Sequence, residues 1–168
     1  MMSRILVAYA TKTGCTQGIA EAIGKTLTSN GFNVDVTSVK DKPSPAGYDG
    51  VIVGSGARIG SWHGMAKKWV SANADTLKGM PVAFFTACLT LANEPEKTDE
   101  VQAYTDDLIA ESGVQPVSYG LFAGWFEPDK FSFVGRKVLE KMDSPKGDFR
   151  DWEAVEAWTR ETAGQLAP

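Results

Sequence analysis

The amino-acid sequence predicts an α/β fold: a doubly wound, five-stranded parallel sheet with helices on both faces. Short apolar runs typical of buried strands alternate along the chain with segments of helical periodicity. Neighbouring parallel strands need a crossover, which is usually a helix and right-handed, so this alternation indicates one sheet wrapped on both sides. The 168 residues contain no internal repeat, low-complexity tract or linker, so we expect residues 1–168 to form a single domain.

The predicted strands differ in how deeply they are buried. Residues 4–10 form an almost unbroken apolar run, which indicates a strand covered on both faces. Residues 33–39 alternate Val34 and Val36 with polar residues, which indicates a half-exposed strand. The other three strands are expected at residues 51–54, 82–86 and 117–123.

The predicted helices carry their apolar residues on one face. They are expected at residues 17–27, 65–74, 96–112, 129–142 and 151–166, and the Ser29-Asn30-Gly31 stretch ends the first of them. In the first three helices, the side chains expected to face the core are Ile19, Ala20, Ile23, Leu27, Met65, Trp69, Val70, Val101, Tyr104, Leu108 and Ile109.

The helix predicted at residues 129–142 follows the aromatic pair Trp125-Phe126 and combines basic with apolar side chains. A basic amphipathic helix can rest on an anionic membrane. We expect instead a helix that packs on the core, because the apolar stripe is no wider than packing requires. The basic residues are Lys130, Arg136, Lys137 and Lys141, beside Phe133, Val134, Val138 and Met142, and the acidic Glu127 and Asp129 precede them.

Composition and charge argue against several classes of protein. The formal net charge of −4 and the isoelectric point near 5.0 disfavour a nucleic-acid partner, because binding to a phosphate backbone needs a basic surface. No apolar run approaches the roughly 18 residues that span a bilayer, and no secretory signal precedes the first strand. Cys15 and Cys88 match neither a disulfide framework nor a zinc spacing, so we expect reduced thiols in the cytoplasm.

Three loops follow the first, third and fourth predicted strands, at residues 11–16, 55–62 and 86–93. In doubly wound sheets, ligands bind at the carboxyl ends of the strands, where the strand order reverses, so these loops should converge on one crevice. The first loop leads directly into a helix, whose N-terminal N–H groups and dipole favour an anion. Its threonine hydroxyls add further donors, and we predict a phosphate site.

Several phosphate and catalytic motifs are absent from these loops. The first lacks the Gly-Lys pair of a Walker A loop, and the glycines from Gly54 to Gly60 are one residue too widely spaced for a dinucleotide fingerprint. Ser55 lacks the flanking glycines of a nucleophile elbow, and His63 is the only histidine. The loops hold no carboxylate cluster for a metal. We therefore predict no catalytic side chain and no metal, but a terminal phosphate and a flat ring.

The first loop, Thr11-Lys12-Thr13-Gly14-Cys15-Thr16, resembles the T/S-x-T-G-x-T phosphate loop of flavodoxins. Residues 52–60 (Ile-Val-Gly-Ser-Gly-Ala-Arg-Ile-Gly), 80–85 (Met-Pro-Val-Ala-Phe-Phe) and 151–153 (Asp-Trp-Glu) resemble the branch of menaquinone-dependent protoporphyrinogen dehydrogenases. The resemblance implies a flavodoxin-like strand order 2-1-3-4-5 with FMN as cofactor. It implies cofactor-binding roles for Thr11, Lys12, Thr13, Gly14, Cys15, Thr16, Ala57, Arg58, Ile59, Gly60, Trp62, Thr86, Ala87, Cys88, Leu89 and Asn93.

In the implied site, the first loop holds the phosphate and the other two loops flank the isoalloxazine. Trp62 either stacks on this ring or caps the second helix. We expect Cys15 to contribute its N–H, Cys88 to contribute a small side chain near the ring, and His63 to open the second helix. An Arg58 guanidinium within ~8 Å of the flavin would favour its anionic reduced form by ~2 kcal/mol, and so raise the potential by on the order of 90 mV. The alternative is an Arg58 side chain that points into solvent. Redox titration of Arg58→Glu tests the hypothesis, which an unchanged potential would refute.

Two functions of different class remain open. The first is an electron carrier that binds FMN and docks to redox partner proteins such as a ferredoxin-type protein or a flavoprotein reductase. The second is an enzyme that oxidises protoporphyrinogen and passes the electrons to a quinone. A nicotinamide-dependent quinone reductase is a weaker third alternative. The scarcity of acids, bases and nucleophiles in the loops favours the carrier, because the flavin itself supplies the redox chemistry.

Overall fold

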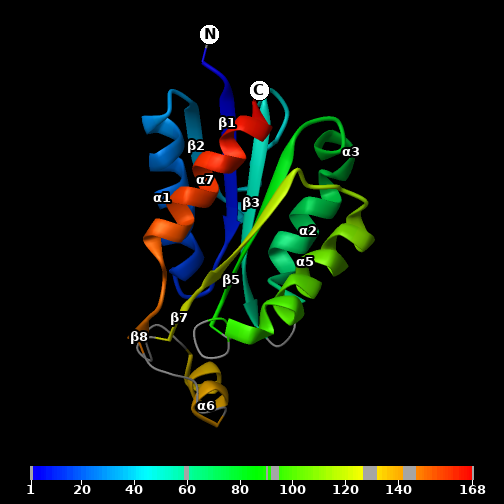
Figure 1. Ribbon diagram of the computed structural model, residues 1–168. Helices are drawn as coiled ribbons and strands as arrows, with labels where there is room; N and C mark the ends of the chain where they lie inside the picture. Colours follow the sequence, from blue (N-terminus) through cyan, green and yellow to red (C-terminus); the bar gives the residue numbers. More distant parts are fainter. Residues whose placement is uncertain are drawn as a thin grey trace.

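The sheet has the predicted parallel, doubly wound arrangement. The computed structural model describes residues 2–58, 61–89, 91, 95–126, 132–141 and 147–167. Its central sheet runs in the order β2-β1-β3-β5-β6 with every neighbouring pair parallel (Figure 1). Numbered along the chain, these five strands follow the order 2-1-3-4-5, which confirms the prediction. They are β1 (Arg4–Ala10), β2 (Asn33–Ser38), β3 (Gly50–Arg58), β5 (Val82–Cys88) and β6 (Ser118–Ala123).

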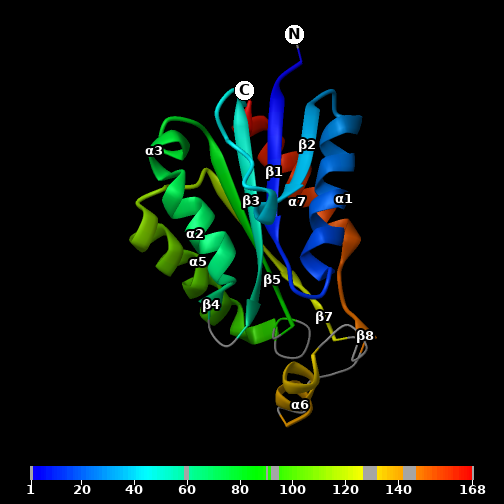
Figure 2. The same cartoon turned by 180° about the vertical axis from the view of Figure 1, so that it is seen from behind.

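Helices cover both faces of this sheet, and each face has its own core. Helices α1 (Cys15–Ser29) and α7 (Trp152–Leu166) lie on one face, and α2 (Gly64–Ala72), α3 (Ala74–Leu77) and α5 (Thr98–Ser112) lie on the other (Figures 1 and 2). Successive strand residues point to opposite faces. Accordingly, Phe85 belongs to the core under α1 and α7, whereas the adjacent Phe84 belongs to the core under α2 and α5.

Several elements extend or divide differently from the prediction. Strand β3 continues four residues beyond 54, because its end pairs antiparallel with β4 (Ser61–Trp62). The helix expected at residues 65–74 is broken at Asn73, whose side-chain amide donates to the carbonyl of Trp69 at 2.8 Å. Short 3-10 turns, η1 (Val39–Asp41) and η2 (Pro95–Lys97), follow β2 and precede α5.

The predicted core residues are largely buried, with one clear error. Met65 was expected to face inward, but its side chain is exposed. The buried stripe of α2 runs through Ala66, Trp69 and Val70, which are three and four residues apart, and Met65 falls just outside it. Tyr104 and Ile109 pack against the edge of the core and are only partly buried.

Helix α6 (Phe133–Lys141) differs most from expectation. It projects beyond the end of the sheet instead of packing on it (Figures 1 and 2). The side chains of Phe133 and Val134 are 69% and 70% exposed, so the expectation of a core-facing helix is wrong. The flanking residues 127–131 and 142–146, including Lys130 and Met142, lie outside the described residues. An unpredicted antiparallel pair, β7 (Trp125–Phe126) and β8 (Gly147–Asp148), lies on either side of this region in the sequence.

Candidate functional site

The loop between β1 and α1 forms a turn that opens onto a helix N-terminus. Gly14 has φ +92°, a left-handed conformation that residues with side chains rarely adopt. Its N–H donates to Thr11 Oγ1 at 2.9 Å, which closes the turn. Gly14 is also the N-cap of α1, so no side-chain oxygen caps this helix, and its first turn contains no acidic residue. The N–H groups of the first turn are therefore suited to an external anion.

The three predicted loops meet at the same edge of the sheet. In the strand register, Ala10 is opposite Ser55, and Gly56 is opposite Ala87. A Cβ added at Gly56 would lie 3.3 Å from Thr16 Oγ1, so the first loop lies directly against the end of β3. The structure thus brings the phosphate loop together with Ala57, Ala87, Cys88 and Leu89, as the sequence predicts.

A fourth segment, which follows β6, reaches the same edge. A Cβ added at Gly124 would lie 3.6 Å from Cys15 Sγ and 3.4 Å from the Leu89 nitrogen. The chain therefore passes between the phosphate loop and the end of β5 immediately before Trp125. Neither Cys15 nor Cys88 forms a disulfide, and both are buried.

The side chains of Trp62 and Thr86 face the core. Trp62 Nε1 donates to Thr86 Oγ1 at 2.7 Å, and Thr86 Oγ1 lies 3.2 Å from Thr105 Oγ1. The indole is 3% exposed and stands edge-on to Phe84, with 5.6 Å between ring centroids. A ring buried in this way presents no face to a ligand, so the structure contradicts the stacking role and favours a packing role at the start of α2.

The next residue, His63, opens α2 as expected. Its Nδ1 accepts the N–H of Met65 at 3.1 Å, and its own backbone N–H donates to Ser55 Oγ at 2.9 Å. These bonds fasten the loop after β3 to the sheet. For the rest of that loop, Ile59 and Gly60 lie outside the described residues, as does Asn93 of the next loop, and only the backbone of Arg58 is described.

Sequence reasoning missed the contacts that brace the phosphate loop. Trp125 Nε1 donates to Thr13 Oγ1 at 2.9 Å, although 112 residues separate the two along the chain. Arg150 lies against this indole, with its guanidinium carbon 4.3 Å from the ring centroid, and its Nη1 donates to the carbonyl of Cys15 at 3.3 Å. No motif or spacing signals these contacts, because the β7–β8 pair creates them.

Two ionisable groups near this edge have shifted pKa values. Hydrogen bonds from Arg150 lower the pKa of Asp148 below the usual aspartate range, although partial burial acts in the opposite direction. Burial raises the pKa of Tyr9, at the end of β1, and the charges of Glu21 and Asp41 act in the same direction. Across the described part of the chain, no three metal-ligating side chains gather in one place, and no helix is long and apolar enough to cross a membrane.

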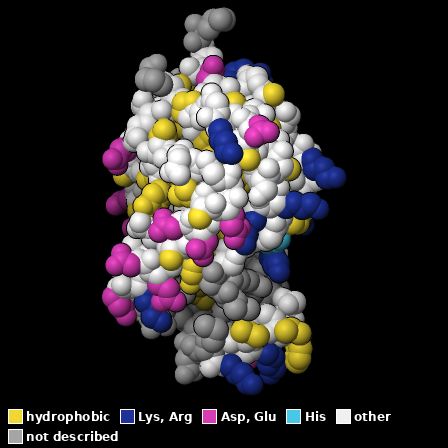
Figure 3. Space-filling view, turned by 90° about the vertical axis from the view of Figure 1, so that its right-hand side faces the viewer, with side chains coloured by type: hydrophobic (Ala, Val, Ile, Leu, Met, Phe, Trp, Pro, Cys, Tyr) yellow, Lys and Arg dark blue, Asp and Glu magenta, His cyan; other side chains and the backbone are white. Residues whose placement is uncertain are grey.

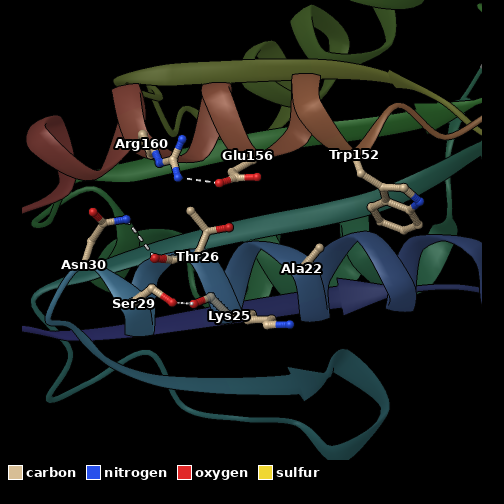
Figure 4. Close-up of a pocket in the computed structure, with 8 residues that line it drawn as sticks. All are labelled: Ala22, Lys25, Thr26, Ser29, Asn30, Trp152, Glu156 and Arg160. Carbon is tan, nitrogen blue, oxygen red and sulfur yellow. Dashed lines mark hydrogen bonds and ion pairs between the residues drawn. The ribbon is translucent and has the colours of Figure 1, made fainter.

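A groove of about 420 Å³ lies elsewhere, between α1 and α7 (Figure 4). It runs along the C-terminal half of α1, whereas the phosphate loop is at the N-terminal end of that helix. Its one arginine, Arg160, is paired with Glu156. The groove is lined by Ala22, Lys25, Thr26, Ser29, Asn30, Trp152, Glu156 and Arg160, none of which belongs to the three loops.

Comparison with known proteins assigns the family. The model of the flavodoxin domain matches residues 6–152. The chain belongs to the flavodoxin family. It is 29% identical to the protoporphyrinogen IX dehydrogenase [quinone] of Escherichia coli K12, over 95% of this chain and 94% of that protein. It is 27% identical to the protein of that name from Leishmania major, over 95% of this chain and 74% of that protein.

Solved flavodoxins share the fold at lower identity. Flavodoxin 1 from Bacillus cereus superposes with a TM-score of 0.65 at 17% identity, over 98% of this chain and 100% of that one. A flavodoxin from the domain Archaea gives 0.64 at 18% identity, over 97% and 98%. FMN is the cofactor that membership of this family implies, and the uncapped, acid-free N-terminus of α1 beside two threonine hydroxyls fits its phosphate.

Proposed function

We propose that this flavodoxin-family protein is a cytoplasmic electron carrier that holds FMN at the carboxyl edge of its sheet and exchanges electrons with redox partner proteins. The observation that supports this proposal most strongly is the turn from Thr11 to Thr16, which opens onto the uncapped, acid-free N-terminus of α1. When bound, FMN supplies the redox chemistry, and the protein supplies binding, orientation and access.

The chain's own residues have distinct tasks in this proposal. The phosphate is held by Thr11, Thr13 and the N–H groups of the first turn of α1. Each charge-assisted hydrogen bond to it contributes roughly 1.5 to 3 kcal/mol. The ends of β3 and β5, near Ala57 and Cys88, flank the ring. Apart from the exposed Lys12, and Arg58 at the end of β3, the described residues of the three loops are hydroxyl-bearing, small or apolar. Residues of these types position a flavin without acting as general acids or bases, which favours a carrier over an enzyme.

The absorption spectrum of the purified protein tests this proposal. We expect a yellow chromophore after FMN addition, stepwise reduction in a redox titration, and rapid electron exchange with a ferredoxin-type protein or a flavoprotein reductase. A protein that gains no visible absorption with FMN would refute the proposal. Bound FMN that exchanges electrons with neither class of partner would refute the carrier role alone.

A second candidate function is oxidation of protoporphyrinogen, or a similar reduced aromatic, with a quinone as electron acceptor. The names of the two relatives suggest it, and the exposed face of α6 gives it a structural basis. Phe133 and Val134 are exposed there beside Lys137 and Lys141. Helix α6 lies at the end of the sheet where β1 ends and the phosphate loop begins (Figure 1), and hydrophobic and basic side chains gather at one end of the molecule in the space-filling view (Figure 3). Exposed apolar and basic side chains on one helix suit an anionic bilayer, where quinones dissolve.

Turnover distinguishes the two candidates. An enzyme should oxidise protoporphyrinogen repeatedly when menaquinone is present, whereas a carrier should react slowly with both compounds. Sustained turnover would therefore replace the carrier proposal by the second candidate, and its absence in FMN-loaded protein would exclude that candidate.

A further inference from the structure

We propose that Trp125 is a positioning residue for the phosphate site, because it directs the hydroxyl hydrogen of Thr13 toward the FMN phosphate, and that Arg150 holds Trp125 in place. This inference rests on the proposed FMN binding and assigns a role to two residues outside the phosphate loop. Both come from the segment that contains β7 and β8, far from residues 11–16 in the sequence.

The direction of the hydrogen bond between Trp125 and Thr13 is unambiguous. An indole N–H can only donate, so the Thr13 oxygen must be the acceptor in the 2.9 Å contact. A hydroxyl oxygen that accepts such a bond turns its own hydrogen toward another acceptor. The bond also polarises the hydroxyl and makes it a stronger donor. Thr13 is thus prepared to donate to an anion that occupies the turn.

The indole also covers the turn itself. A Cβ added at Gly14 would lie 3.7 Å from the Trp125 ring, so the ring faces the turn across the space that a side chain at position 14 would occupy. Together with the hydrogen bond to Thr13, this placement puts the indole directly over the turn.

Arg150 fixes the position of this indole. Its guanidinium lies between two rings, with centroid distances of 4.3 Å to Trp125 and 4.6 Å to Trp152, and its side chain is only 10% exposed. Nε and Nη2 donate to the Asp148 carboxylate at 2.9 and 2.6 Å. The Asp148 carboxylate neutralises the charge of the Arg150 guanidinium. We therefore assign Arg150 the role of holding Trp125 in place, and not that of attracting the phosphate.

Gly18 provides the space that this arrangement requires. A Cβ at Gly18 would lie 2.4 Å from Arg150 Nη1, closer than any real contact. Glycine inside a helix is less favourable than alanine. Helix α1 nevertheless has glycine at position 18, because a side chain there would collide with the Arg150 guanidinium.

The test compares FMN with riboflavin, which has the same ring but no phosphate. In Trp125→Phe we expect FMN affinity, measured by quenching of flavin fluorescence, to fall by up to about tenfold, the effect of losing the one neutral hydrogen bond that orients the Thr13 hydroxyl. Riboflavin affinity should stay unchanged. In a Thr13→Val background, Trp125→Phe should cause no further loss for FMN, because the hydroxyl that it orients is gone.

Trp158→Phe is the matched control. Trp158 Nε1 also donates to a hydroxyl, Ser118 Oγ at 3.0 Å, but on β6 away from the phosphate loop. Its removal should leave the ratio of FMN to riboflavin affinity unchanged. Arg150→Lys, which keeps the charge but loses the forked pairing and the stacking, should shift the ratio in the same direction as Trp125→Phe and by less.

Riboflavin binding also reports whether each variant retains its fold. If Trp125→Phe leaves the ratio of FMN to riboflavin affinity at its wild-type value, the positioning role is refuted. The carrier proposal stands in that case. A further loss for FMN in the Thr13→Val background would refute the positioning role as well. Wild-type protein that binds no FMN would overturn the proposed function itself.

Discussion

The phosphate loop and helix α6 lie at the same end of the sheet but are attached to the fold in opposite ways (Figure 1). Thr13 is tied to Trp125, and the first turn of α1 is tied to Arg150, so distant segments converge on the loop. Helix α6 instead exposes Phe133 and Val134. An element held by contacts from distant segments suits cofactor binding, whereas an uncovered apolar helix suits contact with another surface. We propose that these two tasks belong to separate parts of one end of the molecule.

Two phenylalanine substitutions give the largest expected contrast. Phe122 is buried beside Trp158, with 5.6 Å between ring centroids, on the strand that leads to Trp125. We expect Phe122→Ala to lower the free energy of unfolding by about 3 to 5 kcal/mol, because it leaves a cavity. Phe133→Ala should change it by less than about 0.5 kcal/mol. Urea unfolding measures both, and a loss above about 1 kcal/mol for Phe133→Ala would mean that α6 packs on the fold in solution.

A pair of glycine substitutions tests the bracing of the phosphate loop. Gly18→Ala gains the helix propensity of alanine, but its methyl group displaces the Arg150 guanidinium, so the protein should lose up to about 2 kcal/mol of stability. Gly164→Ala in α7 is the control, since a Cβ there meets nothing within 4 Å. It should leave stability unchanged or raise it by up to about 1 kcal/mol. Equal effects of the two substitutions in urea unfolding would contradict the bracing by Arg150.

Charge reversal on α6 tests the second candidate function. If α6 contacts a bilayer, wild-type protein should bind vesicles that contain phosphatidylserine, and Lys137→Glu with Lys141→Glu should weaken binding by at least about 1 kcal/mol per residue. Lys25→Glu with Lys68→Glu changes two exposed lysines on α1 and α2 and should have a smaller effect. Co-sedimentation measures each affinity. Wild-type protein that does not bind anionic vesicles would remove the structural support for this candidate.

Much of the fold, and the centre of the candidate site, followed from local sequence patterns. The strands were recognisable from apolar runs, because burial on both faces of a parallel sheet requires them. The turn at Thr11 to Gly14 was recognisable because one glycine between a strand and a helix satisfies the left-handed conformation that the structure has there. Both features depend on residues that are close in the sequence.

The side-chain contacts and the exposed helix that the sequence did not predict share a different cause. The partner of Trp62 Nε1 is Thr86, 24 residues away, and that of Trp125 Nε1 is Thr13, 112 residues away. Periodicity cannot indicate which aromatic side chain meets which hydroxyl. Nor can it show whether an amphipathic helix such as α6 has a partner, because its pattern is the same whether its apolar face meets a core or solvent.

The smallest expected effect is the pH dependence that the Asp148–Arg150 pair contributes. The pKa of Asp148 is lowered in the folded protein, chiefly by hydrogen bonds from Arg150. The pair therefore stabilises the fold fully above the unfolded-state pKa, near 4, and its contribution disappears as the pH falls through the lower folded-state pKa. Because Asp148 is 36% exposed, the contribution should stay below about 1 kcal/mol. Urea unfolding at pH 7 should find Asp148→Asn less stable than wild type by this amount, and the difference in stability should become smaller below pH 4. The control Asp106→Asn, on α5, should show no such difference. A gap that persists at low pH would mean that the carboxylate charge is not what holds Arg150 beside the phosphate loop.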